Sequence, residues 1–234
     1  MKFRALRVGR RGRSFLFEIA VVVAGVLIAL VVQELATSWR DRQRAAAVRA
    51  SMHEEIADFA EILRVRQLAG PCIAAKVDSI EALLARSGAT GPWRNVGRPS
   101  YFFSSQGAWN DAAADLLSGQ VTPETFRKYG ELYQGMAQYG ARGQREQEHW
   151  ITLQSLERQD DPVTGERRWR LLEAVAGARN EGLILNATAG QMTALAAELG
   201  VAPNRSLAKL DVAATPLCRK LEATDDRTAS GSNG

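Results

Sequence analysis

Two cysteines, Cys72 and Cys218, are the residues of this chain best suited to covalent chemistry. Their number is even and their spacing matches no metal-binding pattern, so in an oxidising compartment the simplest product is a disulfide between them. In a reducing compartment they would be two buried thiols. The chemistry of this pair therefore depends on where the chain lies in the cell.

The segment 87–107 is rich in glycine, proline and serine, with aromatic residues interspersed. This composition is typical of a long ordered loop, and aromatic walls with a few polar groups are what a small-molecule site requires. The alternative is that the aromatic side chains cap the open end of a helical core. The candidate ligand loop, residues 93–109, contains Trp93, Arg94, Arg98, Tyr101 and Trp109, with Asn110 and Asp111 as further polar groups.

His53 and His149 lie on separate predicted helices, and neither belongs to an HExxH motif or another pair with metal-ligand spacing. We expect both on exposed helix faces. Two acidic pairs are likewise expected at solvated positions rather than as a paired acid and base: Glu54 with Glu55, and Asp160 with Asp161. These residues predict no metal site.

Ser206 and Lys209 form an S-x-x-K sequence, as in some serine acyl-transferases, but the chain contains no KTG partner motif. The sequence also lacks G-x-S-x-G, GxxxxGK(S/T) and GxGxxG, which are typical of hydrolases, NTPases and dinucleotide-binding proteins. We therefore expect neither an enzyme nor a bound cofactor.

The element that decides the location of these residues is an apolar stretch of eighteen residues, 15–32, in which Glu18 is the one charged residue. At about 1.5 Å per residue it forms a helix roughly 27 Å long, close to the roughly 30 Å hydrocarbon core of a bilayer. No convincing small-x-small cleavage site follows it, which favours an uncleaved signal anchor over a cleaved leader. The basic residues before it argue against a buried helix of a soluble protein.

Charges on the two sides of this stretch predict its orientation. Residues 1–14 carry six basic and no acidic residues, whereas the four arginines of residues 36–50 are partly offset by Glu34 and Asp41. The positive-inside rule therefore places the N-terminus in the cytoplasm and the bulk of the chain in the periplasm. The net charge is +4, of which the first fifty residues contribute +7, leaving −3 for the remainder. No nucleic-acid partner is expected from such a distribution.

Residues inside the anchor could also contact a protein. Glu18 is an ionisable group near the start of the stretch, where it acts either as an interfacial anchor or as a proton or partner site within the bilayer. Small residues occur at the spacing that lets two membrane helices approach closely. The candidate membrane-helix interaction residues are Glu18, Ala20, Ala24, Gly25 and Ala29, and the partner is a second copy of the chain or another protein.

Helical periodicity accounts for the rest of the chain. Apolar residues recur at steps of three or four after residue 39, so the membrane helix is expected to continue as a long amphipathic helix that ends at Gly70 and Pro71. Thr122 and Pro123 provide an N-cap and a first helical residue. The apolar face of the first helix contains Val48, Met52, Ile56, Phe59 and Leu63; further helices are predicted over residues 72–86, 108–117, 122–159, 169–185 and 187–199, the last two as a hairpin or one bent helix.

The predicted fold class is all-α: an N-terminal transmembrane helix that continues into a long amphipathic helix, followed by an extracytoplasmic helical bundle. No strand pattern is present. The predicted domains are a basic cytoplasmic leader (1–14), a transmembrane anchor (15–35), a helical extracytoplasmic domain (36–222) and a tail that is disordered by composition (223–234).

The anchor resembles the N-terminal signature of an uncharacterised family of bacterial single-pass inner-membrane proteins. The resemblance rests on Glu18-Ile19-Ala20 and Gly25-Val26-Leu27-Ile28-Ala29-Leu30, followed by Trp39 and a basic helix. Phe17 replaces the glycine that usually precedes the glutamate. The similarity covers residues 15–40 and is looser beyond. It implies an inner-membrane protein with a helical extracytoplasmic domain and no assigned activity.

These observations predict a membrane-anchored periplasmic interaction, scaffold or sensory module. One alternative is an accessory subunit of a larger membrane complex that docks through the anchor. The other is a small-ligand-binding protein that uses the loop 93–109.

Overall fold

The computed structural model describes residues 10–86, 91–158 and 162–223, with side chains from residue 17 onward. Most of the predicted leader, the pair Asp160 and Asp161 and the predicted tail from residue 224 lie outside the described residues. The chain divides into two compact units, Met1–Val48 and Arg49–Gly234.

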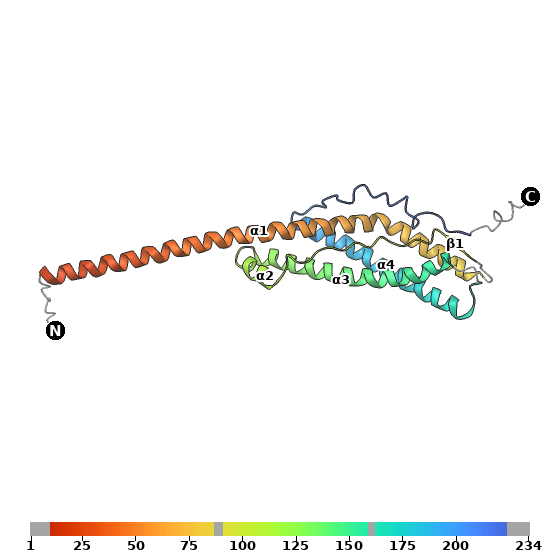
Figure 1. Ribbon diagram of the computed structural model, residues 1–234, viewed down its shortest axis with the longest axis horizontal. Helices are drawn as coiled ribbons and strands as arrows, with labels where there is room; N and C mark the ends of the chain where they lie inside the picture. The colour runs from red at the N-terminus through yellow and green to blue at the C-terminus, as the bar shows by residue number, and fades with distance from the viewer. Residues whose placement is uncertain (1–9, 87–90, 159–161, 224–234) are drawn as a thin grey trace, which may run out of the picture. The chain divides into compact units, whose positions relative to one another are not determined.

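The described residues are predominantly helical, which confirms the all-α prediction (Figure 1). Two short strands pair antiparallel, with Trp93 opposite Ala223 and Arg94 opposite Glu222. No residue pattern in the chain predicted them. The elements are α1 (Arg10–Ala85), β1 (Trp93–Arg94), α2 (Asp111–Ser118), α3 (Pro123–Leu153), the 3₁₀ turn η1 (Gln154–Glu157), α4 (Gly165–Glu198) and β2 (Glu222–Ala223).

In the first unit, α1 carries an apolar segment that no other described residue covers. Its large apolar side chains between Phe17 and Leu35 are 43–70% exposed. Among the described helices, α1 is long and apolar enough, by length and composition, to cross a membrane near the N-terminus of the chain.

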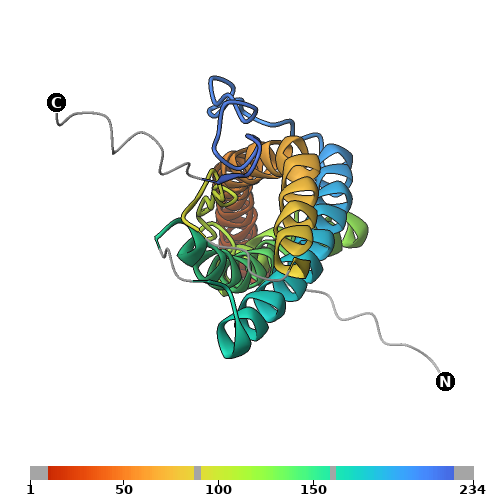
Figure 2. The ribbon, with the colours of Figure 1, turned by 90° about the vertical axis from the view of Figure 1, so that its right-hand side faces the viewer.

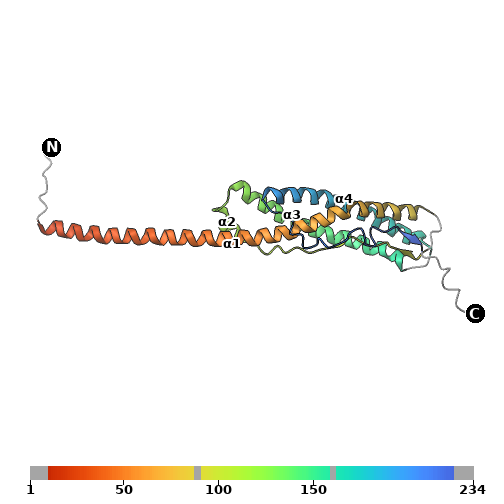
Figure 3. The ribbon, with the colours of Figure 1, turned by 90° about the horizontal axis from the view of Figure 1, so that it is seen from above.

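In the second unit, residues 49–85 of α1 pack with α3 and α4 around a shared core, as the end-on view in Figure 2 shows. The predicted apolar face is buried, since Met52, Ile56, Phe59 and Leu63 are at most 3% exposed. Figure 3 shows the same helices from above. The core continues along the bundle and includes Trp150, Leu153 and Leu171.

The prediction that the first helix ends at Gly70 and Pro71 is wrong, because α1 continues through both residues to Ala85. A proline inside a helix destabilises it by about 3 kcal/mol. Ile73, Val77 and Ile80 continue the buried face, and each buried side chain contributes about 1.5–3 kcal/mol, so two of them already offset the proline. Gly70 serves a close contact instead: a Cβ there would lie 2.8 Å from Oδ1 of Asn186 in α4.

The boundaries of the other helices differ modestly from the predicted ones. Asn110 caps α2 by accepting from the Ala113 amide at 3.0 Å, which starts the helix three residues later than predicted. Thr122 caps α3 as predicted, accepting from the Thr125 amide at 3.2 Å. The predicted helices 169–185 and 187–199 form one helix, α4, without a hairpin.

The segment 199–221 contains no helix or strand, and it runs alongside the part of α1 that belongs to the second unit. The amide of Asn204 donates to the Ala57 carbonyl at 3.3 Å. Further along, a disulfide joins Cys218 to Cys72 of α1, across a sequence separation of 146 residues. In the chain-entropy model, closing so long a loop stabilises a fold by about 4–5 kcal/mol.

Candidate functional site

Arg66 of α1 and Glu146 of α3 form an ion pair inside the bundle. Nη1 of Arg66 donates to Oε2 of Glu146 at 2.6 Å, and Nη2 donates to Oε1 at 2.8 Å. Nη2 also donates to the carbonyl oxygen of Gly182 in α4 at 3.3 Å, so this arginine links three helices. The two side chains are 7% and 2% exposed. We call Arg66, Glu146 and Gly182 the Arg66 centre.

The Nε atom of Arg66 is buried and has no hydrogen-bond partner among the described residues. Arg66 also lines two cavities. The smaller, of about 40 Å³, is lined on its other sides by Arg98, Tyr101 and Tyr139 and has room for water. Burial raises the pKa of Tyr139 to about 12, so its phenol is neutral there.

The larger cavity is a cleft of about 160 Å³ between α1 and α4, which we call the α1–α4 cleft. Its walls are mainly apolar. Two polar side chains besides Arg66 border it, those of Arg179 and Asn186. The residues that form its apolar walls are Gly70, Ile73, Ala74 and Val77 of α1 and Gly182 and Leu183 of α4.

The members of the candidate ligand loop do not converge on one pocket. Trp93 and Arg94 form β1, and Trp93 borders a shallow groove with Arg86 and Lys220. Arg98 and Tyr101 line the small cavity at the Arg66 centre, and Tyr101 donates to the Gly140 carbonyl at 2.9 Å. Trp109 stacks on Tyr133 with 5.6 Å between ring centroids. Asn110 caps α2 and Asp111 is its first residue.

Glu55 is not the solvated residue that we expected. Its carboxylate accepts hydrogen bonds from the Ser105 hydroxyl at 2.7 Å, the Gly107 amide at 2.9 Å and the Ala108 amide at 3.1 Å. The Tyr133 hydroxyl donates to it as well, at 2.9 Å. Burial, and then this carboxylate, raise the pKa of Tyr133. Glu55 therefore fastens the loop to α1 and α3.

The expectation of exposed histidines is also wrong, because both are half-buried. Nε2 of His53 lies 2.7 Å from the Tyr129 hydroxyl. Burial, and then the charge of Arg49, lower the pKa of His53 below its ordinary value of 6.5. The ring of His149 packs over Gly177 of α4, where a Cβ would lie 2.3 Å from it.

A second fastening point joins the loop, α1 and the C-terminal segment. Lys76 is 3% exposed, and its Nζ donates to the carbonyl oxygens of Asn95, Pro216 and Arg219, the last at 2.6 Å. Burial lowers the pKa of Lys76, although Glu157 acts in the opposite direction. Glu157 in turn accepts from the amide of Val96 at 2.8 Å. These contacts hold the backbone of the loop and of the C-terminal segment in place.

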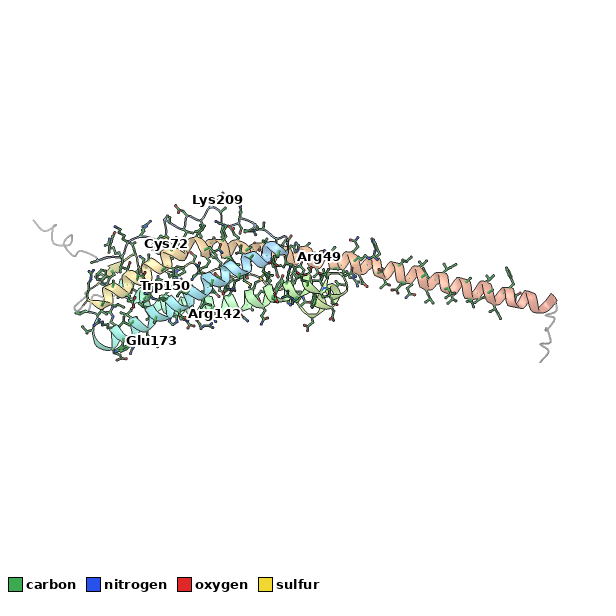
Figure 4. The ribbon with its side chains drawn as sticks, turned by 180° about the vertical axis from the view of Figure 1, so that it is seen from behind. Arg49, Cys72, Arg142, Trp150, Glu173 and Lys209 are labelled. Atoms are coloured by element: carbon green, nitrogen blue, oxygen red, sulfur yellow. A yellow bond between two sulfur atoms is a disulfide. The ribbon has the colours of Figure 1, made fainter. Side chains whose placement is uncertain are left out.

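The remaining candidate residues lie apart from the Arg66 centre. Ser206 and Lys209 are exposed on the irregular C-terminal segment, and Lys209 is labelled in Figure 4. Within the described part of the chain, no group of three or more His, Cys, Asp or Glu side chains is arranged to hold a metal ion. In the first unit, Glu18, Ala20, Ala24, Gly25 and Ala29 are all exposed.

Comparison of the chain with protein-family models, with curated proteins and with solved structures gives no match. The function is therefore inferred from the chain's own residues.

The Arg66 centre was not predicted from the sequence, although the residue pattern contains a signal for it. Arg66 follows Leu63 by three residues and precedes Ile73 by seven, so it lies on the apolar stripe of its helix. Glu146 follows Tyr139 by seven residues and precedes Trp150 by four, so it lies on the apolar stripe of α3. Opposite charges on the buried stripes of two helices predict a buried ion pair.

We predict that Arg66→Met lowers the free energy of unfolding by about 3–5 kcal/mol, because it leaves the buried Glu146 carboxylate without its partner. The double variant Arg66→Met/Glu146→Leu should recover most of this loss. The measurement is denaturant unfolding of the full chain in mild detergent. Arg179→Met is the control: its ion pairs with Asp78 and Glu81 are exposed, so it should cost less than about 1 kcal/mol. Equal losses in the single and double variants would contradict a paired role.

We also predict a pH effect of His53. Its pKa is lowered in the folded state, so the unfolded chain binds the proton more readily near pH 6. This contribution to stability is present above pH 6.5 and is lost as the pH falls through the lowered folded pKa. Unfolding midpoints measured between about pH 7 and 5 should fall less in His53→Gln than in the unsubstituted chain. An unchanged pH profile in His53→Gln would exclude this residue as the source.

Proposed function

We propose that this chain is a single-pass protein of the bacterial inner membrane whose second unit works in the periplasm as an interaction, scaffold or sensory module. The observation that carries the proposal is the uncovered apolar segment of α1. Its large apolar side chains are 43–70% exposed from Phe17 to Leu35. An apolar surface of this extent is not stable in water and requires a covering phase.

Lipid fits this segment better than a protein core does. None of the most apolar stretch of α1 is buried within the structure, whereas the core helix of a soluble protein is mostly buried. The residues that follow fit a membrane interface. Trp39 is 62% exposed, and Arg40 and Arg42 are exposed beside it in the sequence. Tryptophan and long basic side chains are favoured where hydrocarbon meets headgroups.

The orientation rests on two independent features. The basic leader favours a cytoplasmic N-terminus by the positive-inside rule. The disulfide between Cys72 and Cys218 is stable in an oxidising compartment and rare in a reducing one, which favours the periplasm for the second unit. The resemblance of residues 15–40 to a family of inner-membrane proteins agrees with this placement. It adds no activity.

The way in which the second unit is built favours a protein partner over a ligand held by the loop 93–109. Lys76 and Glu157 hold the loop at residues 95–97, and Glu55 holds it at residues 105–108. The loop therefore presents a fixed surface rather than a single aromatic pocket. A surface that is fixed before binding loses little conformational entropy when a partner binds.

We expect the chain to remain in the membrane pellet after an alkaline carbonate wash, with residues 1–14 still present by mass spectrometry. A C-terminal alkaline phosphatase fusion should be active, and a C-terminal fluorescent protein that matures only in the cytoplasm should be dark. A soluble chain that begins after residue 35 would show a cleaved leader instead. A bright fusion with inactive phosphatase would reverse the orientation.

We further propose that the anchor contacts another membrane helix through Ala20, Ala24, Gly25 and Ala29, with Glu18 at the same end. Small residues at this spacing permit close backbone approach, and a Cβ on Gly25 would meet nothing within 4 Å in the isolated chain. The partner is a second copy of the chain or another subunit of a membrane complex.

In-membrane crosslinking followed by mass spectrometry should give a defined adduct that Gly25→Leu reduces. Val26→Leu is the matched control, since it leaves the small residues in place and should give the same adduct as the unsubstituted chain. Self-adducts alone identify a homo-oligomer, and one heterologous adduct identifies an accessory subunit. Absence of any adduct, or equal adducts in both variants, would contradict an interaction through these residues.

A further inference from the structure

The α1–α4 cleft combines apolar walls with one buried donor that lacks an acceptor. Ile73 and Val77 on its α1 side are 4% and 1% exposed, so the floor is closed and apolar. Arg66, which is 7% exposed, also lines the cleft, and its Nε atom has no partner within the described part of the chain. A buried donor without an acceptor is costly, and the cost is relieved when a guest supplies one.

The volume of the cleft defines the size of the guest. It encloses about 160 Å³, comparable with apolar protein cavities of about 150 Å³ that bind benzene. The cleft is partly open, and Leu183 at its α4 edge is 67% exposed. A ring or short chain of roughly six to eight heavy atoms would cover part of this leucine and fill the space.

The charges around the cleft define the polarity of the guest. Both Nη atoms of Arg66 already bind Glu146, so the arginine charge is balanced. Arg179 at the rim is balanced by Asp78 at 2.7 Å and Glu81 at 2.6 Å. The two arginines therefore face three carboxylates, those of Glu146, Asp78 and Glu81, and the site carries one negative charge in excess. An anionic guest would therefore be repelled, whereas a neutral acceptor such as a carbonyl would not.

We propose that the α1–α4 cleft binds a small, neutral, mostly apolar molecule with one hydrogen-bond acceptor, which Nε of Arg66 recognises. The cleft lies wholly within the second unit, so this proposal does not depend on the membrane anchor. It lies between different elements from the loop 93–109, which contributes none of its lining residues.

Two probes of the same shape separate the apolar and polar parts of the proposal. Cyclohexanone carries a carbonyl where methylenecyclohexane carries a carbon–carbon double bond. The readout is NMR of the full chain in detergent micelles, with ¹⁵N-labelled glycine to observe the amides of Gly70 and Gly182 and ¹⁵N-labelled arginine to observe Nε of Arg66. Both probes should shift the glycine amides saturably. Only cyclohexanone should shift the Nε resonance of Arg66 in the manner of a new hydrogen bond.

Ala74→Phe and Ala75→Phe provide a matched pair of variants. Both alanines are exposed on α1, but only Ala74 lines the cleft. Ala74→Phe should fill the cleft and weaken the Kd for cyclohexanone at least about tenfold, and Ala75→Phe should leave it within about twofold. Both variants expose the probes to the same micelles, so partitioning into detergent cancels.

Three results would overturn the proposal. One is the absence of saturable shifts at Gly70 and Gly182 up to the solubility of cyclohexanone, which would leave water as the occupant. Another is equal binding by the two variants, which would mean non-specific partitioning. The third is binding of both probes with no specific response of the Arg66 Nε resonance, which would remove the polar part.

Discussion

Two stretches of irregular backbone, residues 95–110 and 199–221, impose the main constraint on the second unit. Their amide and carbonyl groups cannot be satisfied by regular secondary structure, and buried backbone groups without partners are strongly destabilising. Side chains of the helical elements supply the missing partners. Glu55 accepts from two loop amides, Glu157 accepts from Val96 and Gly97, and Lys76 donates to three carbonyl oxygens. These charges are consequently partly or fully buried.

The same constraint explains why the loop and the C-terminal segment meet so closely. Gly97 has a φ of 63°, and a Cβ there would lie 2.5 Å from the Leu217 amide nitrogen, so glycine is required on both grounds. Cys218 follows Leu217 in the sequence, and its disulfide with Cys72 holds the C-terminal segment against α1. At the Arg66 centre, one arginine joins three helices through its pair with Glu146 and its hydrogen bond to the Gly182 carbonyl. A bundle held at these points is a preformed surface, which suits a module that binds a partner.

Periodicity predicted the helices and the apolar face of α1 well, because one face of a helix must be buried whatever its neighbours are. It failed where tertiary contacts decide. Pro71 was expected to end the helix, but burial of Ile73, Val77 and Ile80 outweighs its local cost. Glu55 was expected in solvent, because its partners at Ser105, Gly107 and Ala108 are about fifty residues away in the sequence.

Arg66 and Glu146 could have been found as charges on two apolar stripes. The α1–α4 cleft could not have been predicted, since it depends on how closely Gly70 and Gly182 let two helices approach.

We propose that α1 anchors the chain in the inner membrane with its second unit in the periplasm, and the two cysteines report on that placement directly. Cells are quenched in acid, and the chain is denatured without reductant, treated with a maleimide and weighed by mass spectrometry. We expect no labelled cysteine until a reductant is added, while a variant lacking residues 15–35, kept in the cytoplasm, takes up two labels. Two labels on the unsubstituted chain before reduction would contradict both the disulfide and the periplasmic placement.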